Sequence, residues 1–149
     1  YIQFWQERLT LDRLSHLDWQ NPPVSLLVLS ACRTAIGDAQ AELGFAGLAI
    51  DAGVKAAVAS LWYVSDRGTL ALMSEFYRSL AIAPTKSEAL RQAQLALLEG
   101  RTTIEGGQLR SIASRGGPIP LPAILQTDRP ENLTHPYYWA AFSVIGNPW

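Results

Sequence analysis

The chain contains one cysteine, Cys32, and two histidines, His16 and His135, which are residue types suited to nucleophilic catalysis. A cysteine thiolate can attack a carbonyl carbon when a histidine within about 3 Å handles the protons. Cys32 lies three residues beyond the apolar stretch 24–29, and open α/β sheets bind ligands beyond the carboxyl ends of their strands. A following helix and Arg33 would both favour the thiolate. The alternative interpretation is a small, inert, buried cysteine.

Other cysteine chemistries do not fit the sequence. A thioredoxin-like site needs a second cysteine, which the chain lacks. A phosphatase-like loop needs an arginine several residues after the cysteine to close the phosphate-binding loop, and the residues after Cys32 do not provide such a loop. The glycines Gly44, Gly47 and Gly53 do not form a dinucleotide-binding pattern. A single cysteine also excludes an internal disulfide and a cysteine-cluster metal site, and it fits a reducing, cytoplasmic compartment.

Composition limits the size and the partners of the molecule. The 149 residues are 48% hydrophobic and 17% charged, which is typical of one folded domain or part of one. The net charge of −1, without any basic run, argues against nucleic acid and anionic membranes as partners. The chain begins with Tyr1 rather than methionine, so we expect a piece of a longer protein.

The first half of the chain predicts a strand, a helix and a second strand. Residues 24–29 are almost continuously apolar, 42–52 have helical spacing, and 56–62 are apolar again. Short connections between such elements predict a parallel βαβ unit. We therefore expect an α/β fold with a mostly parallel sheet flanked by helices.

The second half predicts two capped helices and a glycine- and proline-rich region. Ser65 is expected to cap one helix, and Thr85 with Glu88 matches a capping box for the next. The predicted apolar faces consist of Leu70, Met73, Tyr77 and Leu80 in the first helix, and of Leu90, Ala93, Leu97 and Leu98 in the second. Residues 101–134 predict a hairpin at Gly106-Gly107 followed by an irregular surface excursion, and 138–145 predict a last strand.

Several short motifs together resemble one family, the CHAT domain, a caspase-like bacterial peptidase domain. They include Ser-Ala-Cys-Arg-Thr at 30–34, Ser-Leu-Trp at 60–62 and His-Pro-Tyr-Tyr-Trp at 135–139, and further matches fall at 42–49, 76–77 and 89–93. They follow the family's order and span nearly the whole chain.

The resemblance implies a Cys-His dyad, cleavage of protein or peptide substrates, and fusion to TPR repeats. Caspase-like proteins place the catalytic histidine roughly 50 residues before the cysteine. We therefore expect 1–149 to be the C-terminal portion of a single domain, with the histidine and the first strands upstream of Tyr1. This portion alone should be inactive, and its exposed sheet edge should favour self-association. No metal or organic cofactor is implied.

Neither histidine of the chain is favoured as the base. His16 precedes a strand that would separate it from Cys32 by about 25 Å. His135 precedes Pro136, and capping or packing is the favoured interpretation. A non-catalytic interaction module is the main alternative function. A small-molecule enzyme is disfavoured, because no phosphate-binding loop is present.

Further residues are candidates for the substrate cleft. Asp66 follows the second strand and would bind a basic substrate side chain or cap a helix, while Asp38 and Glu42 would line the cleft or lie solvated in a loop. Trp62 and Trp139 would form cleft walls or belong to the core. The backbone N–H of the cysteine would serve as an oxyanion donor.

Overall fold

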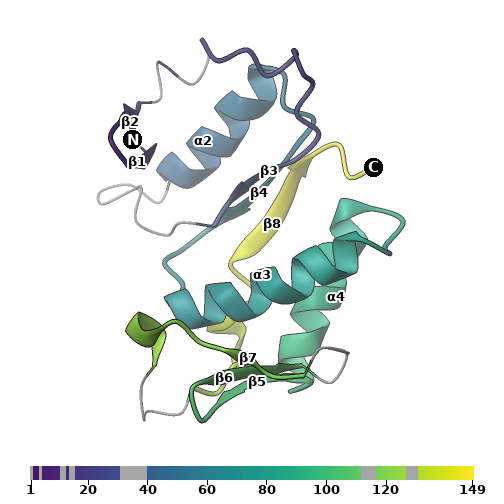
Figure 1. The fold of residues 1–149 in the computed structure, drawn as a ribbon. Helices are drawn as coiled ribbons and strands as arrows, with labels where there is room; N and C mark the ends of the chain where they lie inside the picture. Colours follow the sequence, from purple (N-terminus) through teal and green to yellow (C-terminus); the bar gives the residue numbers. More distant parts are fainter. Residues whose placement is uncertain are drawn as a thin grey trace. The chain divides into compact units, whose positions relative to one another are not determined.

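A computed structural model describes residues 2–3, 5–10, 13, 16–30, 40–111, 117–126 and 131–149. The chain divides into two compact units, Tyr1–Tyr63 with Ala141–Trp149, and Val64–Ala140 (Figure 1). Each unit contains helix and sheet, which confirms the α/β class.

The main sheet of the first unit contains β3 (Leu27–Leu29), β4 (Ala56–Ser60) and β8 (Phe142–Gly146), in the order β3-β4-β8. β3 and β4 are parallel and are joined through α2 (Gln40–Asp51), so the predicted strand–helix–strand unit is confirmed. β8 pairs with β4 in the antiparallel direction, so the described sheet is mixed.

Small apolar side chains fill the core of this unit. All five residues of the central strand β4 are buried. Alternate residues of a strand face opposite sides, and one face, with Leu29, Ala57 and Ala59, packs against Ala46 and Ile50 of α2. Small residues at these positions let the helix approach the sheet closely.

The start of the chain forms a short hairpin, in which β1 (Ile2–Gln3) pairs with β2 (Arg8–Leu9) in the antiparallel direction. The chain then turns where the Asp18 carboxylate accepts the backbone N–H groups of Gln20 and Asn21, each at 3.1 Å.

The second unit contains α3 (Asp66–Leu80) and α4 (Lys86–Leu98), and both predicted caps are confirmed. Ser65 Oγ accepts the Gly68 N–H at 3.1 Å, and Thr85 Oγ1 accepts the Glu88 N–H at 3.0 Å. The capping box is only half formed, because the Glu88 carboxylate accepts hydrogen bonds from Arg91 and Gln92.

The predicted inner face of α3 is only partly correct: Met73 is buried and Leu70 and Leu80 are half-buried, but Tyr77 is not part of that face. Tyr77 is 53% exposed, whereas Glu75 and Phe76 are buried. Glu75 can point inwards because its carboxylate accepts hydrogen bonds inside the unit. The spacing of the apolar residues alone therefore does not define the buried face of the helix. In α4, Leu90, Ala93 and Leu97 are buried as predicted, but Leu98 is 45% exposed.

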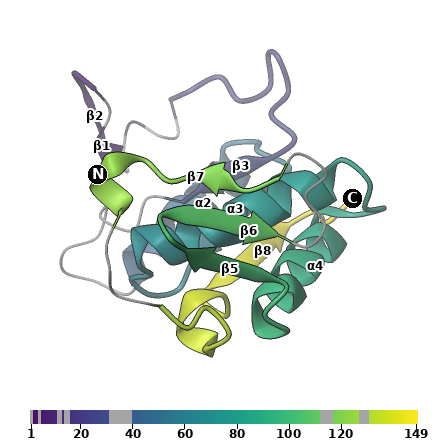
Figure 2. The same cartoon turned by 60° about the horizontal axis from the view of Figure 1, so that its bottom comes forward.

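A small antiparallel sheet follows α4. It contains β5 (Thr102–Glu105), β6 (Gln108–Ser111) and β7 (Ile119–Pro120), in the order β5-β6-β7 (Figure 2). Gly106 and Gly107 join the first two strands with φ values of +55° and +70°, so the predicted hairpin is confirmed.

The excursion expected after this hairpin is less irregular than predicted. β7 adds a third strand, and the 3₁₀ helices η1 (Ala123–Leu125) and η2 (Pro136–Tyr138) follow. The Leu121 N–H donates to the Gly107 carbonyl at 2.8 Å, which attaches this segment to the hairpin turn. η2 also occupies part of the stretch expected to be the last strand, so β8 begins later, at Phe142.

Candidate functional site

The carboxyl ends of β3 and β4 lie side by side at one edge of the first unit's sheet. The parallel register pairs Leu29 with Ala59, so Ser30 leaves β3 beside Ser60, the last residue of β4. The amino end of β8 completes this edge, because Ser60 pairs with Phe142. The Leu61 N–H donates to the Ala141 carbonyl at 2.8 Å, which fixes the chain as it leaves β4.

The face of the sheet turned away from α2 becomes polar at this edge. Val28 and Val58 lie on that face, and the next residues on it are Ser30 and Ser60. Ser60 is 2% exposed and Ser30 is half-buried. The edge therefore carries hydroxyl groups on two adjacent strands, of which only Ser30 is partly exposed, and it lies at the position that binds ligands in open α/β sheets.

Two predicted site residues, Cys32 and Asp38, lie outside the described residues. The backbone N–H of Cys32, predicted as an oxyanion donor, lies outside them too. Glu42 belongs to α2, where only its backbone is described.

The candidates of the second unit have defined positions. Asp66 is exposed in the first turn of α3, where a carboxylate stabilises the helix dipole, and Ser65 provides the capping oxygen. Trp139 is half-buried and its indole N–H donates to the Thr134 carbonyl at 3.1 Å. In the first unit, Trp62 follows β4 and is 38% exposed.

The two histidines are exposed. His135 caps η2, because its Nδ1 accepts the Tyr137 N–H at 3.2 Å. The capping interpretation of His135 is thereby confirmed. Its Nδ1 lone pair is already used in this hydrogen bond and is not free to accept a proton from a thiol.

A buried carboxylate that the sequence does not reveal lies in the second unit. Glu75 is 2% exposed and accepts a hydrogen bond from Thr102 Oγ1 at 2.7 Å, and it also pairs with Arg78. Burial by itself would raise the pKa of Glu75, but hydrogen bonds from Arg78, Ser111 and Thr102 lower it overall. The carboxylate is therefore ionised and joins α3 to both strands of the hairpin.

A second ion pair lies between the start of α3 and the segment before η2. Arg67 Nε is 3.7 Å from Glu131 Oε2, and the Arg67 side chain is 9% exposed. Burial, and then the charge of Glu131, raise the pKa of the neighbouring Tyr138. This group is ordered and largely buried, which is typical of a structural role.

The described residues include no group of three histidine, cysteine, aspartate or glutamate side chains arranged to hold a metal ion. Within the same part of the chain, every helix is too short or too polar to cross a membrane.

The arrangement is that of an α/β protein with a polar edge where two parallel strands end. A family model for the CHAT domain matches residues 1–147, and the chain therefore belongs to this caspase-like, peptidase-related family. No curated protein and no solved structure matches the chain significantly.

Proposed function

We propose that this chain is the nucleophile-bearing part of a cysteine peptidase that cleaves protein substrates, with Cys32 as the nucleophile. The observation that carries the proposal is the parallel pairing of β3 with β4, which brings their carboxyl ends to one edge. Cys32 follows Ser30 by two residues, and two residues of chain reach at most about 7 Å. Membership of the CHAT family supports the same assignment.

The general base in this proposal is a histidine on a segment that precedes Tyr1. His135 is a poor candidate, because its Nδ1 already accepts the Tyr137 N–H. His16 is exposed and precedes the strand at whose other end the cysteine lies. The separation of roughly 50 residues between histidine and cysteine in caspase-like proteins also favours a base upstream.

The proposed reaction has two stages. The Cys32 thiolate attacks the peptide carbonyl carbon, a C–S bond forms, and the backbone N–H of Cys32 stabilises the oxyanion. The protonated histidine donates its proton to the amide nitrogen as the C–N bond breaks, which leaves a thioester. The histidine then takes a proton from water, the hydroxide attacks the thioester carbonyl, and the C–S bond breaks to restore the thiolate.

The remaining parts of the proposal concern the substrate and partners. Asp66 is proposed to bind a basic substrate side chain and Asp38 to line the same substrate cleft, and Asp66 is exposed as its role requires. TPR repeats and the upstream half of the domain are the proposed intramolecular partners, and the cytoplasm is the proposed location.

The test uses a protein that contains both this chain and its upstream segment. Wild type should cleave protein substrates and Cys32→Ala should lose cleavage, because no other residue supplies the nucleophile. Ser25→Ala, an exposed position that precedes β3, is the control and should keep full activity. Undiminished cleavage by Cys32→Ala would refute the proposal.

Thiol labelling separates the peptidase from a non-catalytic interaction module. The chain has one cysteine, so the labelling that a Cys32→Ala variant of the longer protein loses reports on Cys32. In the longer protein, an activated thiol should be labelled rapidly well below the ordinary thiol pKa of about 8.5. Labelling that rises only near that pKa, together with absent cleavage, would favour the interaction module.

A further inference from the structure

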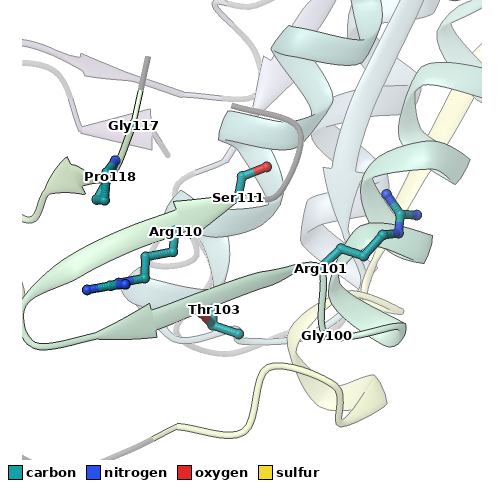
Figure 3. Close-up of a pocket in the computed structure, with 7 residues that line it drawn as sticks. All are labelled: Gly100, Arg101, Thr103, Arg110, Ser111, Gly117 and Pro118. Carbon is teal, nitrogen blue, oxygen red and sulfur yellow. The ribbon is translucent and has the colours of Figure 1, made fainter. Parts of the chain in front are cut away.

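We propose that the outer face of the β5–β6 hairpin binds an acidic peptide through Arg101 and Arg110. This second site is independent of the peptidase proposal and of Cys32. It rests on a pocket of about 310 Å³ in the second unit. The pocket is lined by Gly100, Arg101, Thr103, Arg110, Ser111, Gly117 and Pro118 (Figure 3).

The strand register places the two arginines on one face. Thr103 pairs directly with Arg110, so both side chains lie on the same side of the hairpin. Arg101 precedes Thr103 by two residues, so its side chain lies on the same face of the hairpin, at the position diagonal to Arg110. The partner face is buried, because Ile104 and Leu109 are 6% and 3% exposed. The arginines therefore lie on the face that is open to solvent.

The charge of the pocket favours an anion. Two of its lining side chains are cationic and none is acidic. The exposed carboxylate of Glu105 lies on the same face of the hairpin, outside the pocket lining and towards the turn. Arg110 is exposed and forms no ion pair with any residue in the described ranges. Arg101 Nε donates to Glu99 at 2.6 Å, which leaves four of its five N–H groups for a ligand. The Thr103 hydroxyl adds a neutral donor between the two charges.

The hairpin that carries these arginines is rigidly held. The buried Glu75 carboxylate bonds Thr102 on β5 and Ser111 on β6, so both strands are attached to α3. The Arg101 N–H donates to the Ala96 carbonyl of α4 at 2.9 Å. A rigid support lowers the entropic cost of binding, because only the ends of the arginine side chains must be ordered.

The directions of the side chains favour a peptide over a small anion. In Figure 3 the guanidinium groups of Arg101 and Arg110 point away from each other, on either side of Thr103. One small anion would contact one of them at a time. An extended peptide with carboxylates on separate residues can pair with both.

The test measures binding by fluorescence anisotropy of a labelled peptide of alternating glutamate and glycine. The 149-residue chain should bind this peptide and not its glutamine counterpart, and about 300 mM salt should weaken the binding. Arg110→Gln should weaken affinity about five-fold, and the double variant with Arg101→Gln about twenty-fold. Arg110→Lys should retain most of the affinity, because it keeps the charge.

Two further variants distinguish a site from general attraction. Glu99→Gln should tighten binding about two-fold, because it releases Arg101 from its competing carboxylate. Arg91→Gln removes another exposed arginine, in α4 and outside the pocket, and it should leave affinity unchanged. Equal weakening by Arg91→Gln and Arg110→Gln, absent binding, or complete competition by inorganic phosphate at equal charge would each overturn the proposal.

Discussion

The two units differ in the residues that they bury. In the first unit, Ser60 is the only buried polar residue among those described, and the core consists largely of alanines and other small apolar side chains. The second unit buries Arg67, Glu75, Ser79 and Thr102. The first unit therefore has an almost purely apolar core, whereas the second adds to its own apolar core a buried polar network around Glu75 that joins residues far apart in the sequence.

The largest expected effect is the loss of the Glu75 carboxylate. Glu75→Ala leaves the Thr102 and Ser111 hydroxyls without their acceptor and Arg78 without its partner. We expect about 3 kcal/mol less stability to urea unfolding, because breaking a buried charged network leaves unsatisfied polar groups. Glu99→Ala breaks an exposed ion pair and should cost under about 0.5 kcal/mol. Equal losses would show that burial does not set the contribution of the Glu75 carboxylate.

Acid unfolding provides a second measure of the same carboxylate. The pKa of Glu75 in the folded chain lies below the ordinary glutamate value of 4.5, because Arg78, Ser111 and Thr102 donate hydrogen bonds to the carboxylate. Its ionised form therefore stabilises the fold fully above about pH 4.5, and this contribution is lost as the pH falls through the lower folded pKa. The stability difference between wild type and Glu75→Gln should shrink below about pH 4.5. A difference that stays constant there would show that the charge is unimportant.

The features predicted correctly from the sequence are local ones. The capping hydrogen bonds of Ser65 and Thr85 each join residues three positions apart, and the hairpin turn consists of two glycines. Short sequence patterns are therefore enough to identify these features. The edge formed by β3 and β4 was also predictable, because two apolar runs with a helix between them specify parallel strands.

The features missed from the sequence depend on distant partners. Glu75 and Thr102 are 27 residues apart, and no periodicity links them, so the buried face of α3 was assigned incorrectly. The strand β7 was missed because proline and glycine dominate its surroundings, and only pairing with β6 defines it. The start of β8 was set too early, since His135 caps a 3₁₀ turn there.

A glycine substitution tests the close packing of the first unit. Gly146 has φ +89°, and a Cβ at this position would lie 2.7 Å from the Lys55 carbonyl oxygen and 2.7 Å from Ile50 Cδ1. The backbone oxygen cannot move aside without disturbing the strand, so Gly146→Ala should lower stability by about 2 to 3 kcal/mol in urea unfolding.

Gly44→Ala is the matched control for this substitution. Gly44 lies within α2, and among the described residues nothing lies within 4 Å of the added Cβ. Alanine favours the helix, so this variant should gain roughly 0.5 to 1 kcal/mol. If both variants lowered or both raised the stability, close packing around Gly146 would not be what stabilises the first unit.

The smallest expected effect concerns the cap of α4. This prediction compares a local hydrogen bond of the second unit with the hydrogen bonds that Glu75 forms to residues far away in the sequence. Thr85→Ala removes the acceptor for the Glu88 N–H and should cost about 1 kcal/mol in urea unfolding, while Thr85→Ser should keep most of the stability. The cost is smaller than for Glu75 because water can reach the half-buried cap and replace the lost acceptor. A loss as large as that of Glu75→Ala would mean that burial does not set the strength of polar bonds in this unit.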